Sequence, residues 1–468
     1  MILIDVSMAN LASNNARQIY NQIPGLNIYQ NDDAGLQLNI GGRGLNPNRT
    51  ANFNTRQNNY DISADALGYP ESYYTPPPEG LEEIQILRGA ASLQYGTQFG
   101  GLINFKIKRP KPEERFELIT RNTTGSNNLF TNFTSVSSSN EKSSYYGYVN
   151  YKNGDGFRPN SEFESINTFH NFNYNLDEKS KITGEITYME YLAHQAGGLS
   201  DFMFANDPFQ SNRERNWFEI KWFLYNLKYL LQISEDSSFS FNFFGLDAQR
   251  NSLGFRTNRV DQIDYGEERD LIKGDFKNFG FESRYLTSFN FLNKKSYLLL
   301  GAKYYNSFSQ SVQGPGSSSK DADFNFDYIN FPNYVNQSEY SYPNNNLAIF
   351  GENIFYINES LSITPGFRFE NINTSLDGYY RKINLDAAGN TIYNERFDES
   401  DTKKRKFLLL GLGLSYKKRG LELYTNISQN FRSVTFADIS IMNPAYAINP
   451  NIDDELSLIH ISEPTRQL

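Results

Sequence analysis

Cysteine is absent from the 468-residue chain, and histidine and tryptophan are rare, at 3 and 2 residues. The lack of cysteine excludes disulfides, thiolate metal sites and a cysteine nucleophile. The start, MILIDVSM, has no basic segment and no long apolar core, so it is not a secretory signal. The longest apolar run, Phe407 to Leu414, is far shorter than the roughly 20 residues that a spanning helix needs. A helical membrane protein is therefore excluded.

Positive charge is also scarce, because 44 Lys and Arg residues face 53 acidic ones and leave a net charge of -9. Nucleic acid, which calls for a basic stripe, is not an expected partner. His170 and His194 have no nucleophile elbow beside them, so we expect no catalytic residue and no enzyme. The acidic stretch Asp321 to Asp327 lacks the ligand spacing of a calcium loop, and we expect neither a direct metal site nor a cofactor.

Aromatic residues are abundant, at 15% with 37 Phe and 32 Tyr, which is typical of the girdles of a transmembrane β-barrel. After Arg109-Pro110 the sequence alternates with a period of two. Along one strand, Leu361, Ile363 and Phe367 face one way, whereas polar residues that include Arg368 face the other. Charged residues on the second face predict a wet or plug-filled interior in place of an apolar core.

Turn spacing predicts the topology of this sheet. Short polar turns are expected at Asn140-Glu141, Asp177-Glu178, Glu235-Asp236, Asn293-Lys294, Asn358-Glu359 and Lys417-Lys418. Long loops are expected at the opposite ends of the strands, over His194 to Asn216, Asn251 to Asp275, Ser309 to Asn344 and Ile372 to Thr402. Short turns on one side and long loops on the other are typical of bacterial outer-membrane barrels. A soluble sandwich, with a turn every 8 to 12 residues or so, fits less well.

The turns predict about thirteen strands between Arg115 and Arg432, whereas plugged barrels close with about 22. Open edges in lipid leave backbone groups unpaired, at several kcal/mol each, so we expect the barrel to be truncated at its C-terminus. The stretch Leu456 to Arg466, LSLIHISEPTR, breaks the alternation and reads like a translated sequencing-library adapter. We therefore expect residues 456–468 to be an assembly artefact.

A glycine-rich stretch, Leu81 to Lys108, separates this part from what precedes it. Its ordered elements are Arg88-Gly89, Ser92, Tyr95-Gly96, Gly100-Gly101, Ile103-Asn104 and Lys108. This pattern closely resembles the end of the plug domain of TonB-dependent outer-membrane transporters. The resemblance implies a mainly β fold, in which an N-terminal α+β plug (1–109, truncated at its N-terminus) lies inside an incomplete antiparallel barrel (110–455).

The rest of the predicted plug begins with a short amphipathic helix between Asn14 and Ile23, and continues through a second glycine-rich turn, Gly41 to Thr50. The polar and aromatic segment Asn52 to Pro78 is expected to be loop. In the resembled family such loops form the plug apices that touch the ligand. The candidates are Arg56, Gln57, Asn58, Asn59 and Tyr73, with plain solvated loop residues as the alternative.

The segment from His194 to Phe218 resembles the ferric-citrate branch of the same family. The shared elements are Gly197-Gly198-Leu199, Phe204 with Asp207-Pro208, Gln210-Ser211, and Arg213 with Arg215-Asn216-Trp217. A carboxylate chelate of iron is anionic, and guanidinium groups match carboxylate geometry. Arg56, Arg213 and Arg215 are the candidates for that role. The alternative for the two loop arginines is a salt bridge or a contact with lipopolysaccharide phosphate.

Four further residues are candidates for holding the plug in place. In the resembled family, plug arginines of the glycine turns pair with carboxylates of the barrel wall, which here implies Arg43 and Arg88. Glu82 and Glu83 extend that network in this interpretation. Loss of one partner from a buried pair is costly, so removal should loosen the plug. Turn residues that simply face solvent are the alternative.

By resemblance, the expected function is energy-coupled uptake of a ferric chelate, either ferric citrate or a carboxylate siderophore, with iron as cargo. The expected partners are TonB with its inner-membrane energising complex, and the lipids and lipopolysaccharide of the outer membrane of a Gram-negative bacterium. The expected location is that outer membrane. Import of cobalamin or a glycan is the alternative within this class, and a passive porin or an adhesin is the alternative outside it.

Overall fold

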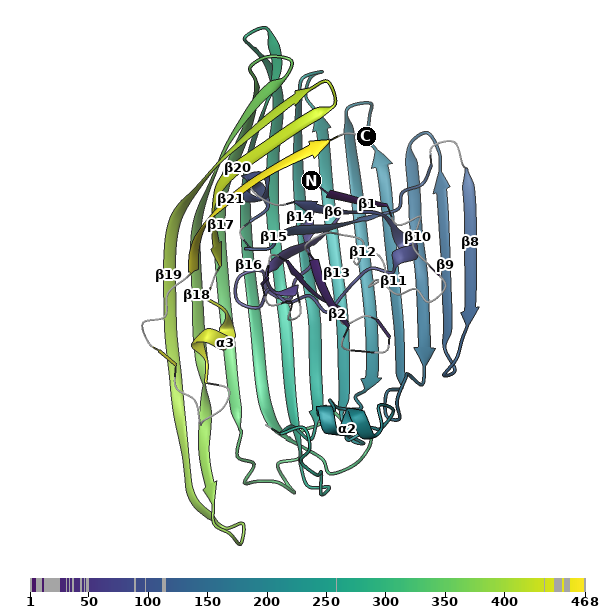
Figure 1. Cartoon of the computed structure of the whole chain (residues 1–468), viewed down its shortest axis with the longest axis vertical. Coiled ribbons are helices and arrows are strands. Elements are labelled where there is room, and N and C mark those ends of the chain that lie inside the picture. The colour runs from purple at the N-terminus through teal and green to yellow at the C-terminus, as the bar shows by residue number, and fades with distance from the viewer. Residues whose placement is uncertain are drawn as a thin grey trace.

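The computed structural model contains a curved antiparallel sheet, the wall, and a smaller unit in its hollow, the plug (Figure 1). The structure describes residues 2–5, 11, 26–30, 32, 34–35, 38–42, 44–45, 47, 50–87, 90–96, 98–111, 115–257, 259–432, 434–441, 448–449 and 455–466. The helix expected between Asn14 and Ile23 lies outside the described residues.

The wall runs in unbroken chain order from β8 to β21, with every neighbouring pair antiparallel. Its strands are β8 (Phe116–Thr124), β9 (Phe130–Ser139), β10 (Ser143–Gly154), β11 (Phe163–Asn175), β12 (Ser180–His194), β13 (Trp217–Gln232), β14 (Ser237–Gly254), β15 (Arg269–Phe291), β16 (Lys294–Gly316), β17 (Ser338–Tyr356), β18 (Leu361–Leu385), β19 (Thr391–Lys418), β20 (Leu421–Arg432) and β21 (Glu455–Arg466). β8 to β20 are the thirteen strands that the sequence predicts, with the predicted limits.

The stretch expected to be an adapter is placed as β21, paired along β20 from Leu421↔Arg466 to Arg432↔Glu455. Its origin as an artefact stays a prediction. After β20 the chain turns inward, and the short helix α3 (Phe436–Ile439) lies in the hollow of the wall (Figure 1). There the Phe436 ring stacks on Tyr342 of β17 with 4.0 Å between the ring centroids.

All six predicted short turns lie at one end of the wall, and the long loops lie at the other (Figure 1). The last long loop is shorter than predicted. β18 and β19 continue as a ladder from Leu361↔Tyr416 to Leu385↔Thr391, so most of 372–402 is strand. The residues of this hairpin are polar, yet their backbones still pair as strands. A strand that extends beyond the barrel needs no apolar face.

The two faces of the wall differ as the alternation predicts. On β19, Leu408, Leu410 and Leu412 point outward and are 54%, 53% and 40% exposed. On the inner face, polar side chains such as Arg368 and Glu370 of β18 are buried against the plug. The inner face of the wall is therefore polar, and the plug fills the space inside it. This confirms the predicted orientation of the two faces of the sheet.

The plug is built on a five-stranded sheet in the order β1-β6-β7-β4-β5, beside a two-stranded one, β2-β3. The strands are β1 (Ile2–Asp5), β2 (Leu26–Gln30), β3 (Leu38–Gly42), β4 (Phe53–Gln57), β5 (Tyr60–Asp61), β6 (Leu81–Leu87) and β7 (Gly101–Ile107). Two 3-10 helices, η3 (Pro78–Gly80) and η4 (Ala90–Tyr95), flank β6. η4 thus holds the central part of the glycine-rich motif.

The expectation that residues 52–78 form only loop is wrong for its first part. β4 pairs in parallel with β7 and is buried at every residue. Asn58 and Asn59 have φ of 46° and 76° and make a tight hairpin turn to β5, which Asn tolerates better than most residues. Polar residues hide this strand from a hydrophobicity pattern because it is buried against the polar inner face of the wall.

Candidate functional site

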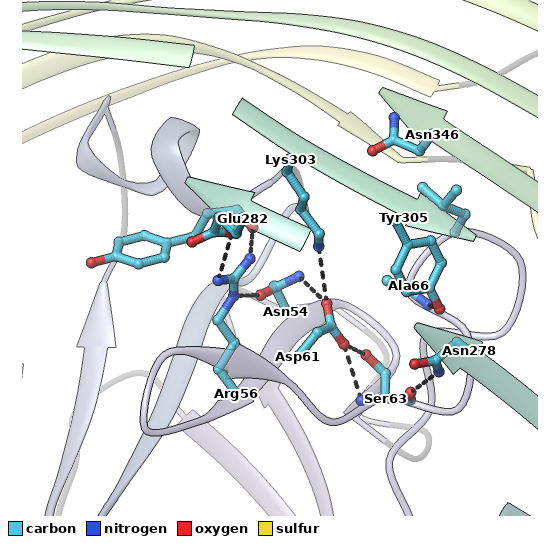
Figure 2. Close-up of polar contacts among 12 residues, drawn as sticks. Asn54, Arg56, Asp61, Ser63, Ala66, Asn278, Glu282, Lys303, Tyr305 and Asn346 are labelled. Carbon is cyan, nitrogen blue, oxygen red and sulfur yellow. Dashed lines mark hydrogen bonds and ion pairs between the residues drawn. The ribbon is translucent and has the colours of Figure 1, made fainter. Parts of the chain in front are cut away.

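Arg56 crosses from the plug to the wall, and its side chain is 1% exposed. Its Nη1 pairs with Glu282 Oε2 of β15 at 3.3 Å, and its Nε donates to Asn54 Oδ1 at 2.8 Å (Figure 2). Its Nη2 donates to the Tyr95 carbonyl at 2.8 Å. Glu282 also accepts from Arg284 Nε at 2.8 Å. One buried carboxylate between two guanidinium groups offsets the cost of removing these charges from water.

A second ionic contact lies beside the first. Lys303 Nζ of β16 is 3.7 Å from Asp61 Oδ2 of the plug (Figure 2). Asp61 Oδ1 accepts from Ser63 Oγ at 2.6 Å, and Asn54 Nδ2 donates to Asp61 Oδ2 at 3.4 Å. Asn54 therefore links the two ion pairs into one network.

The carbonyl end of η4 faces the same network. Arg368 Nη1 donates to the carbonyls of Leu93 and Gln94 at 3.3 and 3.4 Å. Arg284 Nη1 donates to Gln94 Oε1 at 2.7 Å, and its guanidinium carbon lies 4.7 Å from the centroid of the Tyr95 ring. The last carbonyls of a helix lack partners within it and carry partial negative charge, so cations stabilise this end. The motif thus presents backbone acceptors to arginines of the wall.

Asp65 joins the plug to β16 and β17 without a cation. Its side chain is fully buried and accepts from Ser307 Oγ at 2.6 Å and Asn344 Nδ2 at 3.1 Å. The backbone amides of Leu67 and Gly68 donate to it at 3.0 and 3.2 Å. Burial raises the pKa of Asp65, although these hydrogen bonds oppose the shift. The carboxylate fixes the turn at residues 65–69 against the wall.

On the opposite side the plug meets β11 and β12 through amide donors. Gln57 Nε2 donates to Thr187 Oγ1 at 3.0 Å, and Asn58 Nδ2 donates to Glu185 Oε1 at 2.9 Å. Asn171 of β11 donates to the same Glu185 oxygen at 2.8 Å. Asn59 faces the plug itself, since its amide donates to Asn104 Oδ1 at 2.9 Å.

Arg56, Gln57, Asn58 and Asn59 therefore lie in and after a buried strand, and the predicted exposed apex at these residues is wrong. Their side chains contact the wall or the plug core. Whether they also bind a ligand stays a prediction. The Asn-Asn pair before Tyr60 was the available signal for a hairpin, because two consecutive Asn residues suit a turn with positive φ.

Tyr73 lies on the face of the plug toward the long loops. Its ring packs against Phe218 and Trp222 of β13, at centroid distances of 5.8 and 6.1 Å, and its hydroxyl is 2.7 Å from that of Tyr69. Tyr69 in turn stacks on Phe276 of β15 at 5.0 Å. An aromatic layer thus covers this face, and a ligand role for Tyr73 stays a prediction.

The two predicted loop arginines, Arg213 and Arg215, connect neighbouring loops by hydrogen bonds. Arg215 forms a bidentate contact with Asp264 and donates to the carbonyls of Glu267 and Ser318, at 2.8 and 3.0 Å. Arg213 donates to the carbonyl of Val260 at 3.2 Å. The salt-bridge alternative agrees with the contacts of Arg215, whereas the described contacts of the Arg213 guanidinium are with backbone carbonyls, the Thr257 hydroxyl and the Phe255 ring. Their proposed binding of a chelate requires that some of these donors be released.

Arg269, at the start of β15, holds the same loops together and was not anticipated. It is fully buried, and its Nη1 donates to the carbonyls of Arg215 and Asp321 at 3.1 and 2.8 Å. Its Nε donates to the Ser317 carbonyl at 2.7 Å. No local motif marks this residue, because its partners come from loops that are distant in sequence.

The predicted locking residues are only partly described. Arg43 and Arg88 lie outside the described residues. Glu83 accepts from Gln85 Nε2 at 2.6 Å, within the plug, and Glu82 is exposed. Among residues that the structure describes, neither glutamate forms an ion pair with the wall, so their part in a lock stays a prediction. The described plug cations and anions that do pair with the wall include Arg56, Asp61 and Glu79.

A cavity of 640 Å³, the outer cavity, lies between the plug and the long-loop end of β11 and β12. Gln30 and Asp32 line it from the plug, Tyr191 and His194 line it from β12, and Arg158 lines it from the loop between β10 and β11. The Tyr191 hydroxyl donates to Asp32 Oδ2 at 2.9 Å. The lining is polar and combines both signs of charge, which suits a hydrophilic ligand that arrives from the loop side.

Over the described ranges, the structure has no group of three acidic or histidine side chains able to hold a metal ion. Among the described residues, no helix is both long enough and apolar enough to cross a bilayer.

Comparison with known proteins gives two family matches. The TonB-dependent receptor plug domain matches residues 6–102, and the TonB-dependent receptor-like beta-barrel matches residues 167–458. Among curated proteins, the ferric enterobactin receptor PirA of Pseudomonas aeruginosa is 30% identical over 132 residues, which are 25% of this chain and 16% of that protein. The chain thus spans a small share of this relative.

Solved structures share the fold at low identity. The unliganded ferric citrate transporter FecA matches with a TM-score of 0.75 and 20% identity, over 93% of this chain and 63% of its own. The siderophore receptor PiuA from Acinetobacter baumannii matches with 0.72 and 12%, over 96% and 67%. The ferric yersiniabactin uptake receptor FyuA from Yersinia pestis matches with 0.69 and 13%, over 99% and 67%. Because the barrel match alone covers more than half of the residues, this chain belongs to the TonB-dependent receptor family.

Proposed function

We propose that the protein takes up a ferric chelate across the outer membrane of a Gram-negative bacterium, with energy supplied by TonB and its inner-membrane complex. Proteins of this family are transporters, not enzymes. The observation that carries the proposal is the outer cavity, which opens between the plug and the wall on the loop side. A ligand bound there is separated from the short-turn side by the plug, and the plug is tied to the wall by buried ions.

The finer proposal is that the chelate is ferric citrate or a carboxylate siderophore. Support comes from the fold shared with a ferric citrate transporter and from arginines near the loop side. Arg158 lines the outer cavity, and Arg213 and Arg215 lie in the adjoining loops. Guanidinium groups pair with carboxylates in a bidentate geometry, as Arg215 does here with Asp264.

Two measurements test this function in the source bacterium. Cells that lack the gene should take up radioactive iron from ferric citrate more slowly than the parent, and dissipation of the proton gradient should abolish the difference. Unimpaired uptake from citrate, with loss of uptake from a catecholate chelate, cobalamin or a glycan, would replace the substrate. Uptake that continues without the gradient would favour a passive porin, which the tied plug argues against.

A further inference from the structure

A second cavity lies at the opposite ends of the two strands that border the outer cavity. This inner cavity, of 960 Å³, is at the short-turn end and is lined by Asn173 and Asn175 of β11 and by Lys181 of β12. The outer cavity is lined by Phe163 and His194, at the other ends of β11 and β12. The two cavities are therefore the two ends of one boundary, here called the seam, where the plug lies against β11 and β12.

Between the cavities, the polar contacts of the seam include hydrogen bonds from amide groups, and Tyr60 of the plug belongs to the same buried hydrophobic cluster as Phe169 of β11 and Met189 of β12. Gln57 donates a hydrogen bond to Thr187, and Asn58 and Asn171 both donate to Glu185. A neutral hydrogen bond contributes about 0.5–1.5 kcal/mol and one to a carboxylate about 1.5–3 kcal/mol, whereas removal of one partner of a buried ion pair costs about 3–5 kcal/mol. The seam is therefore expected to open at a lower cost than the side of the plug that Arg56 and Glu282 hold.

Cations gather at the inner end of the seam. Lys106 of β7 and Arg109, which follows it, come from the plug side, and Lys181 and Lys228 come from β12 and β13. The charges of Arg109 and Lys228 act on Lys106, and both also act on Lys181 and on Glu185. Arg109 and Lys181 line the inner cavity itself, together with Arg115 and Lys142.

These cations have few partners of opposite charge. Within the described part of the chain, the side chains of Lys106, Arg109, Lys181 and Lys228 form no hydrogen bond and no ion pair. The carboxylates near them are the buried Glu185, Glu83 beside Lys106, Glu282 beside Lys228, and Glu141 in the lining of the inner cavity. Burial, with the charges of Arg109 and Lys228, lowers the pKa of Lys106 to about 8. Lys106, Lys181 and Lys228 are half-buried, and Arg109 is exposed. Four basic side chains and one acidic one, Glu141, line the inner cavity, so an anion that enters it is stabilised by the excess of positive charge.

We propose that the seam is the route of the cargo and that its inner end is a binding site for a small polyanion of the carboxylate class. This inference rests on the proposed function for its direction, from the outer to the inner cavity. The cations Lys106, Arg109, Lys181 and Lys228 attract the negatively charged chelate toward the short-turn end, after the amide contacts of Asn58 and Gln57 have opened.

A thiol reporter tests the anion site without any assumption about the cargo, since the chain has no cysteine of its own. Thr183 of β12 lies between Lys181 and Glu185 on the inner face, and its Oγ1 donates to Asn173 of the inner cavity at 2.7 Å. In isolated outer membranes, Thr183→Cys should react at least about tenfold faster with anionic sulfonatoethyl methanethiosulfonate than with the cationic trimethylammonium analogue, relative to a free thiol.

The matched control reporter is Thr364→Cys, which occupies the corresponding position of β18, three residues after the strand begins. It should show no preference for the anionic reagent. Adding Lys106→Gln and Lys228→Gln to the Thr183 reporter should lower its preference to about one-third or less. Lys221→Gln, on the same strand β13 but paired with Glu219 at 3.2 Å, should leave it unchanged. A Thr183 reporter without preference, or without reaction, overturns the proposed site.

Uptake separates this inference from the proposed function. The Lys106→Gln, Lys228→Gln receptor should bind the ferric chelate at the cell surface as the parent does, and should import it several-fold more slowly. If the reporter shows its preference but ferric citrate is not imported by the parent, the substrate is wrong and the anion site stands. Parent-like import by the neutralised receptor would overturn the route.

Discussion

The two sides of the plug meet the wall by different chemistry. Toward β15 to β18, Arg56 and Asp61 pair with Glu282 and Lys303, and Arg368 holds the carbonyl end of η4. Toward β11 to β13, amide groups of the plug meet the wall, and a cavity lies at each end of the contact. One side therefore acts as an anchor, and the other is the side on which the plug separates most easily.

The difference follows from the cost of burial. A carboxylate such as Glu282 tolerates burial because two guanidinium groups face it, and neither can leave without exposing an uncompensated charge. On the seam, an amide that separates from its partner can be hydrated at little cost. A pull on the plug is then expected to rotate it about the β15–β18 side.

The strongest way to break this comparison is to remove the anchor carboxylate. Glu282→Gln leaves Arg56 and Arg284 buried without an anion, and we expect a loss of about 3–5 kcal/mol in the stability of the plug within the wall. The loss of stability is measured by the hydrogen-exchange rates of the backbone amides of β4 and η4 in detergent. Glu359→Gln is the control, because Glu359 is 87% exposed and its pair with Lys294 contributes at most about 1 kcal/mol. Equal exchange in the two variants would contradict the anchor.

Asp65→Ala is expected to have the next largest effect. It leaves Ser307, Asn344 and the amides of Leu67 and Gly68 without their shared acceptor, at about 1–3 kcal/mol for each group that stays dry. The amides of Leu67 and Gly68 should exchange much faster than in the parent. Protection that persists would mean that water or another acceptor replaces the carboxylate.

Gly68→Ala tests the contact between the plug and α3. A Cβ at Gly68 would lie 2.0 Å from Cε1 of Phe436, so the ring must leave its stack on Tyr342, at about 1–3 kcal/mol. Faster proteolysis after Phe436 is the expected result. Gly184→Ala is the matched control, because nothing lies within 4 Å of the added Cβ, and it should leave the cleavage rate unchanged.

Asn58→Ala probes the seam and should cost at most about 1.5–3 kcal/mol, the range for a hydrogen bond to a carboxylate, because Glu185 keeps its hydrogen bond from Asn171. Thermal unfolding of this variant beside Glu282→Gln measures the contrast between the two sides directly. If Asn58→Ala destabilised the plug as much as Glu282→Gln does, the two sides would be equivalent.

The smallest expected effect is a pH dependence at Lys106, because this half-exposed ammonium group is screened by solvent. The folded pKa of Lys106, about 8, lies below the ordinary lysine value of about 10.4, so folding opposes its charged form. The stability of the parent should therefore rise modestly between about pH 8 and 10, and Lys106→Gln should remove this rise. Added citrate should reduce the rise in the parent by favouring the ammonium form. A flat profile in the parent would contradict the burial of this charge.

Several features were predictable because they depend on local rules. Alternation in segments such as Leu361 to Phe369 requires a strand with two different faces, and short polar turns such as Asp177-Glu178 require hairpins. The thirteen predicted wall strands follow from these two rules. The order of glycines between Arg88 and Gly101 was specific enough to identify the plug.

The candidate site was less predictable. Arg56 was expected to face a ligand at an apex, but it lies on a buried strand and pairs with Glu282, 226 residues away. Arg213 and Arg215 were expected to meet a chelate, but Arg215 is paired with Asp264. Arg269 holds the same loops together, although no local sequence pattern predicted it. A charged side chain has the same local pattern whether its partner is a ligand, a loop or the wall.

The amino-acid sequence by itself determined the plug motif, the alternating wall and the end at which the long loops lie, because backbone geometry and side-chain polarity act over a few residues. Only the tertiary structure decided which charges are paired and which are left unpaired around Lys106 and Lys228. That choice depends on burial and on contacts between residues that are distant along the chain, and it is what distinguishes the anchored side of the plug from the seam.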